Sequence, residues 1–164
     1  KLGDVLWMRE MEVMEKVRFR VQQQAVLDRL PLVHRGCIDA TGLGMQLAEA
    51  AEESSQGRVK AVTFTPHTVN ELAVTLQAHF DGRTFRVPED PKLRADLLSI
   101  RSINTATGKR LDANRTDGHG DRFWAAALAT MAATNAGAGW GGPPVKVAKP
   151  VHRFSRFIPR LLLP

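Results

Sequence analysis

The sequence "GCIDATGLGMQLAEAAEE", residues 36–53, gives the strongest indication of the fold of this chain. An apolar run ends in Asp39, a short turn containing Gly42 and Gly44 follows, and strong helix formers begin at once. A buried strand that passes through a tight turn into a helix is half of a strand-helix-strand unit, and such units pack in layers around a sheet. The chain is therefore predicted to adopt an α/β or α+β fold.

Strands and helices alternate along the rest of the chain. The helical spacing of Leu72, Leu76 and Phe80 is one example, and Asp81-Gly82 ends that helix. Two extended arms are expected around Thr107-Gly108. The predicted strands are 4–14, 32–39, 58–64 and 84–87, and the predicted helices are 18–30, 44–57, 68–80, 89–100 and 121–133. A central sheet flanked by helices accommodates this order.

The length of 164 residues predicts about one domain. No apolar run approaches the roughly 20 residues of a membrane span, and a single cysteine, Cys37, suits a reducing cytoplasm. After Ala133 the sequence becomes rich in Gly, Ala and Pro. We therefore expect a folded domain over residues 1–134 and a basic C-terminal extension over residues 135–164.

The chain is basic, with 23 Lys+Arg against 17 Asp+Glu and a net charge of +6. Such a balance favours polyanionic partners and says nothing about the fold. Part of the excess lies in the C-terminal extension, which has no acidic residue.

Asp39 has several possible roles. In open α/β sheets, ligands bind beyond the carboxyl ends of the strands, which is where Asp39 falls. Alternatively, Asp39 or Thr41 caps the following helix. A dinucleotide-binding loop is disfavoured because "GLGMQL" lacks the third glycine, and "TATGKR" lacks the upstream glycine and the following Ser or Thr of a phosphate loop.

A second polar group precedes the last helix in "RTDGHGDRFWAAALA", residues 115–129. Asp117, His119 and Asp121 crowd one turn, and Asp121 stands at the helix start. Capping explains one aspartate but not the whole cluster, although an exposed polar loop remains the alternative.

The strings "CIDATGLGMQLAE", "VKAVTFTP", "FRVPEDPKLRADLLSIRS" and "DGHGDRFWAAALA", in this order, resemble the C-terminal nuclease domain of phage terminase large subunits. The likeness is greatest to the Mu-like phage and prophage type, and it covers about residues 1–134. It implies an RNase H-like (RuvC-like) fold with a mixed central sheet flanked by helices. It also implies a two-metal-ion endonuclease that uses Mg²⁺ or Mn²⁺ to cleave double-stranded DNA during packaging. The implied partners are DNA, the phage portal and the small terminase subunit, in the cytoplasm of a bacterial host.

The resemblance assigns Asp39 and Asp121 as catalytic metal ligands. Asp117 and His119 are accessory, as a further ligand or as a group that contacts water or phosphate. The expected contacts to DNA phosphates, which carry no sequence information, are Lys109, Arg110, Arg115 and Arg122.

One departure from the family pattern affects the expected activity. The family has a first catalytic aspartate on its first strand, whereas the opening "KLGDVLWMREMEV" looks like the turn that follows this strand. The missing aspartate is thus expected upstream of Lys1, because Asp4 lies in a turn-like setting. The nucleotide-hydrolysing motor domain of a terminase is also not in the sequence. The alternatives are therefore a catalytically incomplete prophage remnant that docks to DNA or the portal, or another RNase H-like nuclease such as a junction resolvase.

Overall fold

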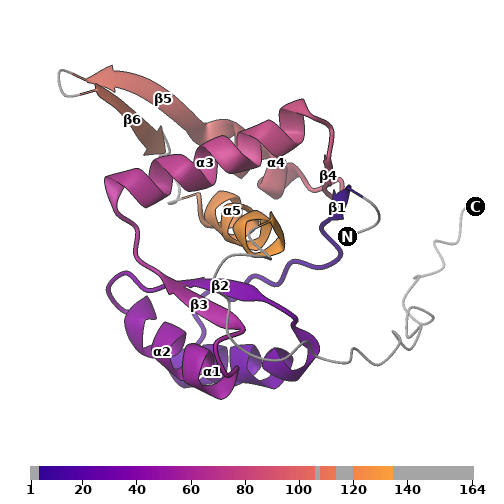
Figure 1. Cartoon of the computed structure of the whole chain (residues 1–164), viewed down its shortest axis with the longest axis vertical. Coiled ribbons are helices and arrows are strands. Elements are labelled where there is room, and N and C mark those ends of the chain that lie inside the picture. The colour runs from indigo at the N-terminus through magenta and orange to yellow at the C-terminus, as the bar shows by residue number, and fades with distance from the viewer. Residues whose placement is uncertain (1–3, 106–107, 114–119, 135–164) are drawn as a thin grey trace, which may run out of the picture.

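The computed structural model describes residues 4–105, 108–113 and 120–134, and the side chains of 4–101 and 120–134. Strands and helices alternate as predicted, which confirms the α/β class (Figure 1). The elements in order are β1 (Leu6–Trp7), α1 (Phe19–Arg29), a 3-10 turn (Leu30–Leu32), β2 (Gly36–Asp39), α2 (Gly44–Ser54), β3 (Val59–Val62), α3 (Pro66–Asp81), β4 (Phe85–Arg86), α4 (Pro91–Ser99), β5 (Ile100–Thr105), β6 (Gly108–Ala113) and α5 (Asp121–Thr134).

Two predicted strands are shorter in the structure. The strand expected over residues 4–14 is confined to β1, because β1 finds its partner only in the two residues of β4. The strand expected over residues 32–39 begins at Gly36. Pro31 and its neighbours form the 3-10 turn instead, since the fixed φ of proline suits the start of a helical turn.

The described strands pair in twos. β2 and β3 are parallel, with Asp39 opposite Val62, and α2 makes the crossover between them. β1 and β4 are also parallel, while β5 and β6 form an antiparallel hairpin. The described part of the chain therefore contains three two-stranded sheets, where one continuous central sheet was expected.

Helix α5 lies at the centre of the molecule, between α3 and the β2–β3 pair (Figure 1). Ala126 and Ala127 are fully buried, and their small side chains allow close approach of neighbouring elements. They pack in one cluster with Leu72 and Leu76 of α3 and with Val62 of β3. The alanine-rich sequence of the last helix therefore reflects its central position.

The opposite face of the β2–β3 pair has a smaller core. Leu30, Ala51 and Val59 join the 3-10 turn and α2 to β3. The guanidinium of Arg58 donates to the carbonyl oxygens of Leu30 and Val33, at 3.2 and 2.6 Å. Near β3, one face of the strand pair is thus covered by α5 and the other by α2 and the 3-10 turn. No helix in the described ranges is long and apolar enough to cross a membrane.

Candidate metal centre

Asp39 is the last residue of β2, and its side chain is half-buried. Its Oδ1 accepts the backbone N–H of Thr41 at 2.8 Å, which holds the carboxylate in a local turn. The hydroxyl of Thr41 accepts the N–H of Phe64 at 3.1 Å. The N-terminal cap of α2 is Leu43, without a side-chain hydrogen bond. The helix-cap interpretation of Asp39 and Thr41 is therefore wrong.

Two glycines shape the turn after Asp39. Gly42 has a φ of +58°, in the left-handed region that favours glycine. A Cβ at Gly44 would lie 2.3 Å from the carbonyl oxygen of Asp39, where no side chain fits. The glycines thus bring the start of α2 against the backbone of Asp39, and they need no dinucleotide to explain them.

Asp121 is the first residue of α5, and it is exposed. Gly120 precedes it with a φ of +71°, and its carbonyl oxygen accepts the N–H groups of Phe123 and Trp124 at 2.9 and 3.1 Å. A carboxylate in the first helical turn is favoured by the partial positive charge there. Asp121 is therefore held on a rigid helix with its side chain open to solvent.

Two contacts connect the surroundings of the two aspartates. The rings of Phe64 and Trp124 meet edge to face, with centroids 5.3 Å apart. The Phe64 backbone is in turn bonded to the Thr41 side chain. Trp124 lies three residues after Asp121, and residues three apart share one side of a helix. These contacts bring the start of α5 to the carboxyl ends of β2 and β3, the end that carries Asp39.

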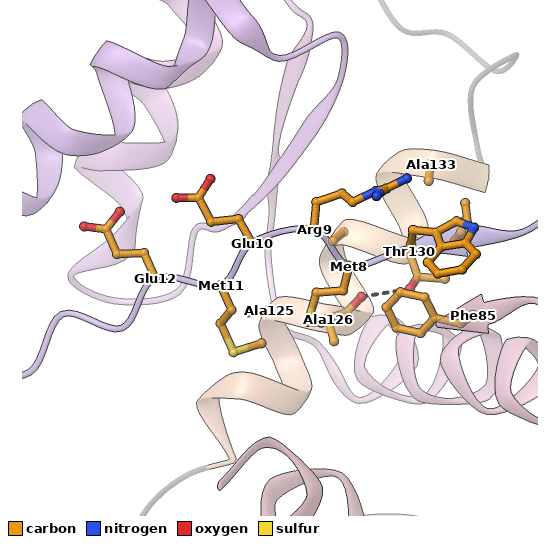
Figure 2. A pocket seen from close by; sticks show the side chains of 13 residues that line it. Met8, Arg9, Glu10, Met11, Glu12, Phe85, Ala125, Ala126, Thr130 and Ala133 are labelled. Carbon is orange, nitrogen blue, oxygen red and sulfur yellow. Dashed lines mark hydrogen bonds between the residues drawn. The ribbon is translucent and has the colours of Figure 1, made fainter. Parts of the chain in front are cut away.

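Two cavities lie along α5 on either side of its exposed alanines. One, of about 790 Å³, separates α5 from β2 and includes Asp39 in its wall. The other, of about 520 Å³, lies between α5 and the extended segment that follows β1 (Figure 2). Both are lined by Ala125, Ala129 and Ala133. The groove beside Asp39 is therefore mostly apolar, with the Asp39 carboxylate at one end of its β2 side and His34 and Arg35 at the other.

The structure reveals a buried carboxylate that the sequence analysis did not single out. Asp96 on α4 is 1% exposed, and its Oδ2 accepts the N–H of Arg122 at 3.2 Å. The Arg122 Nη1 lies 3.5 Å from the same oxygen, and its Nη2 lies 3.9 Å from Glu15. The sequence signal for a buried position was the spacing of Asp96, which follows the apolar Leu93 by one helical turn.

The structure describes the remaining predicted site residues to different extents. Arg122, expected at DNA, is 16% exposed at its side chain and engaged by two carboxylates. Lys109 and Arg110 lie on β6, whose backbone alone is described. Arg115, Asp117 and His119 lie outside the described residues.

The donor chemistry of Asp39 and Asp121 fits a divalent cation in kind, because Mg²⁺ and Mn²⁺ prefer hard carboxylate oxygens. Oδ1 of Asp39 accepts the N–H of Thr41, and among the described residues the second oxygen has no hydrogen-bond donor. Within the described ranges, no three His, Cys, Asp or Glu side chains form a group that could hold a metal ion. The described residues therefore supply two carboxylates, and further ligands would come from elsewhere.

Comparison with known proteins gives one family and two solved structures. A family model described as the terminase RNaseH-like domain matches residues 1–133. The large terminase nuclease domain of Thermus phage P74-26 has a TM-score of 0.54 at 19% identity, over 71% of this chain and 60% of that chain. The large terminase nuclease of thermophilic phage G20c, solved with bound magnesium, has a TM-score of 0.46 at 25% identity, over 57% and 49%. No curated protein matches the chain.

The likeness to the P74-26 domain shows a shared fold, and the description of the matching family model identifies it as RNase H-like. The chain spans about half to three fifths of the length of these solved domains.

Proposed function

The chain belongs to the family of terminase RNase H-like domains, and from this membership we propose that it is the endonuclease part of a phage DNA-packaging terminase. In this proposal the intact protein uses divalent cations to cleave double-stranded DNA during genome packaging. Asp39 and Asp121 are the catalytic metal ligands.

One observation carries the proposal. The contacts from Thr41 to Phe64 and from Phe64 to Trp124 link the loop after β2 to the first turn of α5. Asp39 begins that loop and Asp121 begins that turn. Two carboxylates from distant parts of the sequence thus share one end of the parallel strand pair, where α/β folds place their ligand sites.

The chemistry follows from what each residue can do. Thr41 fixes one oxygen of Asp39, so the carboxylate is oriented before any ligand arrives. Asp121 adds an exposed carboxylate from a rigid helix. A bound Mg²⁺ or Mn²⁺ ion would acidify a water and stabilise the leaving oxygen of the phosphodiester, and two ions are expected in the intact site. We assign Asp117 and His119 to the accessory role of a further ligand or a water- or phosphate-contacting group.

DNA contacts are proposed to be mainly to phosphates, because electrostatics supply affinity without sequence preference. Lys109 and Arg110 on β6, with Arg115, are the proposed contacts. Arg122 is left out of this set because Asp96 and Glu15 already engage its guanidinium.

The proposal extends to the organisation and partners of the chain. Residues 1–134 form the nuclease domain, and residues 135–164 form an extension that carries part of the positive charge. The portal and the small terminase subunit are the expected partners, in the cytoplasm of a bacterial host. A Mu-like phage or prophage source is part of the same proposal.

Nicking of supercoiled plasmid in the presence of Mn²⁺ tests the function. The chain is assayed alongside a longer one that reaches upstream through the expected first strand. Asp39→Asn and Asp121→Asn should each abolish nicking by the active chain. Asp28→Asn, an exposed aspartate on α1, is the matched control and should leave nicking unchanged. Nicking at the wild-type rate by either of the first two variants would remove that aspartate from the catalytic set.

A docking module without chemistry is the second candidate. It is favoured by the lack of a three-ligand group among the described residues. It predicts DNA binding that weakens with salt and no nicking by either the shorter or the longer chain.

A further inference from the structure

Asp96 is the most buried charged side chain of the described residues, at 1% exposure. An ionised carboxylate in such a place costs free energy unless charge and hydrogen bonds compensate it. Here the backbone N–H and the guanidinium of Arg122 lie 3.2 and 3.5 Å from its Oδ2. These two groups both belong to the second residue of α5.

The start of α5 also lies against the end of α4, where the last turn of α4 is closed by a hydrogen bond of its own. The Ser99 hydroxyl donates to the carbonyl oxygen of Asp96 at 2.8 Å. A Cβ at Gly120 would lie 3.2 Å from Cδ1 of Ile100 and 3.9 Å from the Ser99 Oγ, so the backbone of Gly120 lies against this corner. Residues 96–100 therefore form the support on which the first turn of α5 rests.

The two sides of this first turn have different anchors. Arg122 contacts α4, whereas Trp124 contacts Phe64 after β3. Asp121 shares the side of Trp124 because the two are three residues apart. Anchoring Arg122 to Asp96 thus fixes the rotation of α5 about its axis, and with it the direction of the Asp121 side chain.

The charges fit this arrangement. Asp96 accepts one of the N–H groups that a helix start leaves unpaired, and its negative charge suits the positive end of the helix. Arg122 balances that charge. The carboxylate of Asp121 is then left exposed to bind a cation.

We infer that Asp96 is a positioning residue, which acts through Arg122 to hold the Asp121 carboxylate where it shares a divalent cation with Asp39. This inference rests on the proposed function. Asp96 itself touches neither cation nor DNA in this account. Its loss frees the first turn of α5, and the cation is then held by Asp39 without Asp121.

NMR line broadening by added Mn²⁺ on the whole chain tests this without an activity assay. The paramagnetic ion broadens amide signals near it, so two groups of amides are compared. One group follows Asp39, at residues 40–42, and the other starts α5, at residues 120–123. In the wild type both groups should broaden over the same range of Mn²⁺ concentration.

Asp96→Ala should reduce the broadening at residues 120–123 relative to residues 40–42 and raise the Mn²⁺ concentration required about 10-fold, as loss of outer-shell partners does. Asp96→Asn keeps the size and one hydrogen-bond acceptor but loses the charge, so it should give a smaller change in the same direction. If the alanine variant fails to fold, the asparagine variant decides.

Two controls separate positioning from general destabilisation. Asp90→Ala removes the N-terminal cap of the same helix α4 and should leave the ratio of broadening unchanged. Glu15→Gln removes the outer, exposed partner of Arg122 and should also leave it unchanged. An unchanged ratio in both Asp96 variants would overturn this inference and leave the proposed metal site standing. No Mn²⁺ broadening of either group in the wild type would overturn the proposed metal site, and the inference with it.

Discussion

At Gly44, a single missing side chain allows α2 to start against the backbone of Asp39. A Cβ there would lie 2.3 Å from a carbonyl oxygen, and backbone cannot move aside as a flexible side chain can. Gly44→Ala should therefore destabilise the protein by about 1–3 kcal/mol, the usual cost of overpacking. Urea unfolding measures the change.

Gly42→Asn is the matched control in the same turn. Nothing lies within 4 Å of its Cβ position, and asparagine tolerates a positive φ better than most residues. Its effect should be small. Equal stability of Gly44→Ala and the wild type would show that the close approach at Asp39 does not exist in solution.

Burial raises the pKa of the Cys37 thiol to about 11, although nearby Lys60 acts in the opposite direction. The unfolded thiol ionises near its ordinary value of 9.0. Between these values the unfolded chain has lost a proton that the folded chain retains, so the free energy of unfolding falls as pH rises. The contribution is complete below pH 9 and is lost towards pH 11.

Urea unfolding at several pH values above 8 checks this, with Cys37→Ala as the reference because lysines titrate in the same range. The wild type should lose more stability than the variant as pH rises. Parallel curves would contradict the raised pKa of this half-buried thiol. The wild-type thiol should also react slowly with iodoacetamide at pH 8, since the thiolate is the reactive form.

The positions of Asp39 and Asp121 could be predicted because a strand end and a helix start are local signals, whereas their proposed role as metal ligands came from the resemblance to the terminase family. Asp96 could not be predicted in this way, because its role depends on α5 folding back onto α4. Its helical spacing with Leu93 indicated a buried position but not a partner. The sequence analysis placed Arg122 at the DNA without its partner, because the pairing of Arg122 with Asp96 is a tertiary contact that the local sequence does not indicate.

Among the elements, α4 has a cap that can be tested by pH. Asp90 accepts the N–H groups of Lys92 and Leu93, at 2.7 and 3.0 Å. These bonds, that of Leu93 first, hold the pKa of the carboxyl below its ordinary value of 3.8. The stabilisation is therefore present above that value and is lost as pH falls below it.

Asp90→Ala should lower the melting temperature at pH 7 and have less effect at pH 3, because the unfolded carboxyl is largely protonated there and the lowered pKa of the folded state then contributes less stability. Thermal unfolding followed by circular dichroism measures both. The exposed Glu89 beside it is the control, and Glu89→Ala should shift the melting temperature little at either pH. An equal Asp90→Ala shift at both pH values would contradict the cap.

Helices were predicted more closely than strands. The helix predicted over residues 68–80 is observed as α3, Pro66–Asp81, since proline and the Thr65 cap are local signals. The strand predicted over residues 4–14 reduces to Leu6–Trp7. Helical hydrogen bonds lie within the segment, whereas a strand needs a partner that the local sequence does not identify.

At the scale of the whole molecule, α5 organises the fold. The alternation of strands and helices predicted the α/β class. The division of the strands into pairs around α5 could not be predicted, because it depends on the packing of all the elements together.

DNA affinity should depend strongly on salt, because the proposed contacts are to phosphates. Lys109→Ala should weaken binding to unrelated DNA sequences equally and reduce the slope of log affinity against log salt by about 1. Fluorescence anisotropy at several salt concentrations measures this. Arg20→Ala, at an exposed position on α1, is the control and should leave the slope unchanged. A flat salt dependence of the wild type would remove the proposed phosphate contacts.

Whether Asp39 and Asp121 hold the same divalent cation can be measured by a titration of Mn²⁺ followed by electron paramagnetic resonance. Free Mn²⁺ is measured with the wild type, Asp39→Asn, Asp121→Asn and the control Asp28→Asn. The account predicts weak binding by the wild type, unchanged binding by the control, and at least about 10-fold weaker binding by each of the other two variants. Wild-type Mn²⁺ affinity in either Asp39→Asn or Asp121→Asn would contradict the shared site.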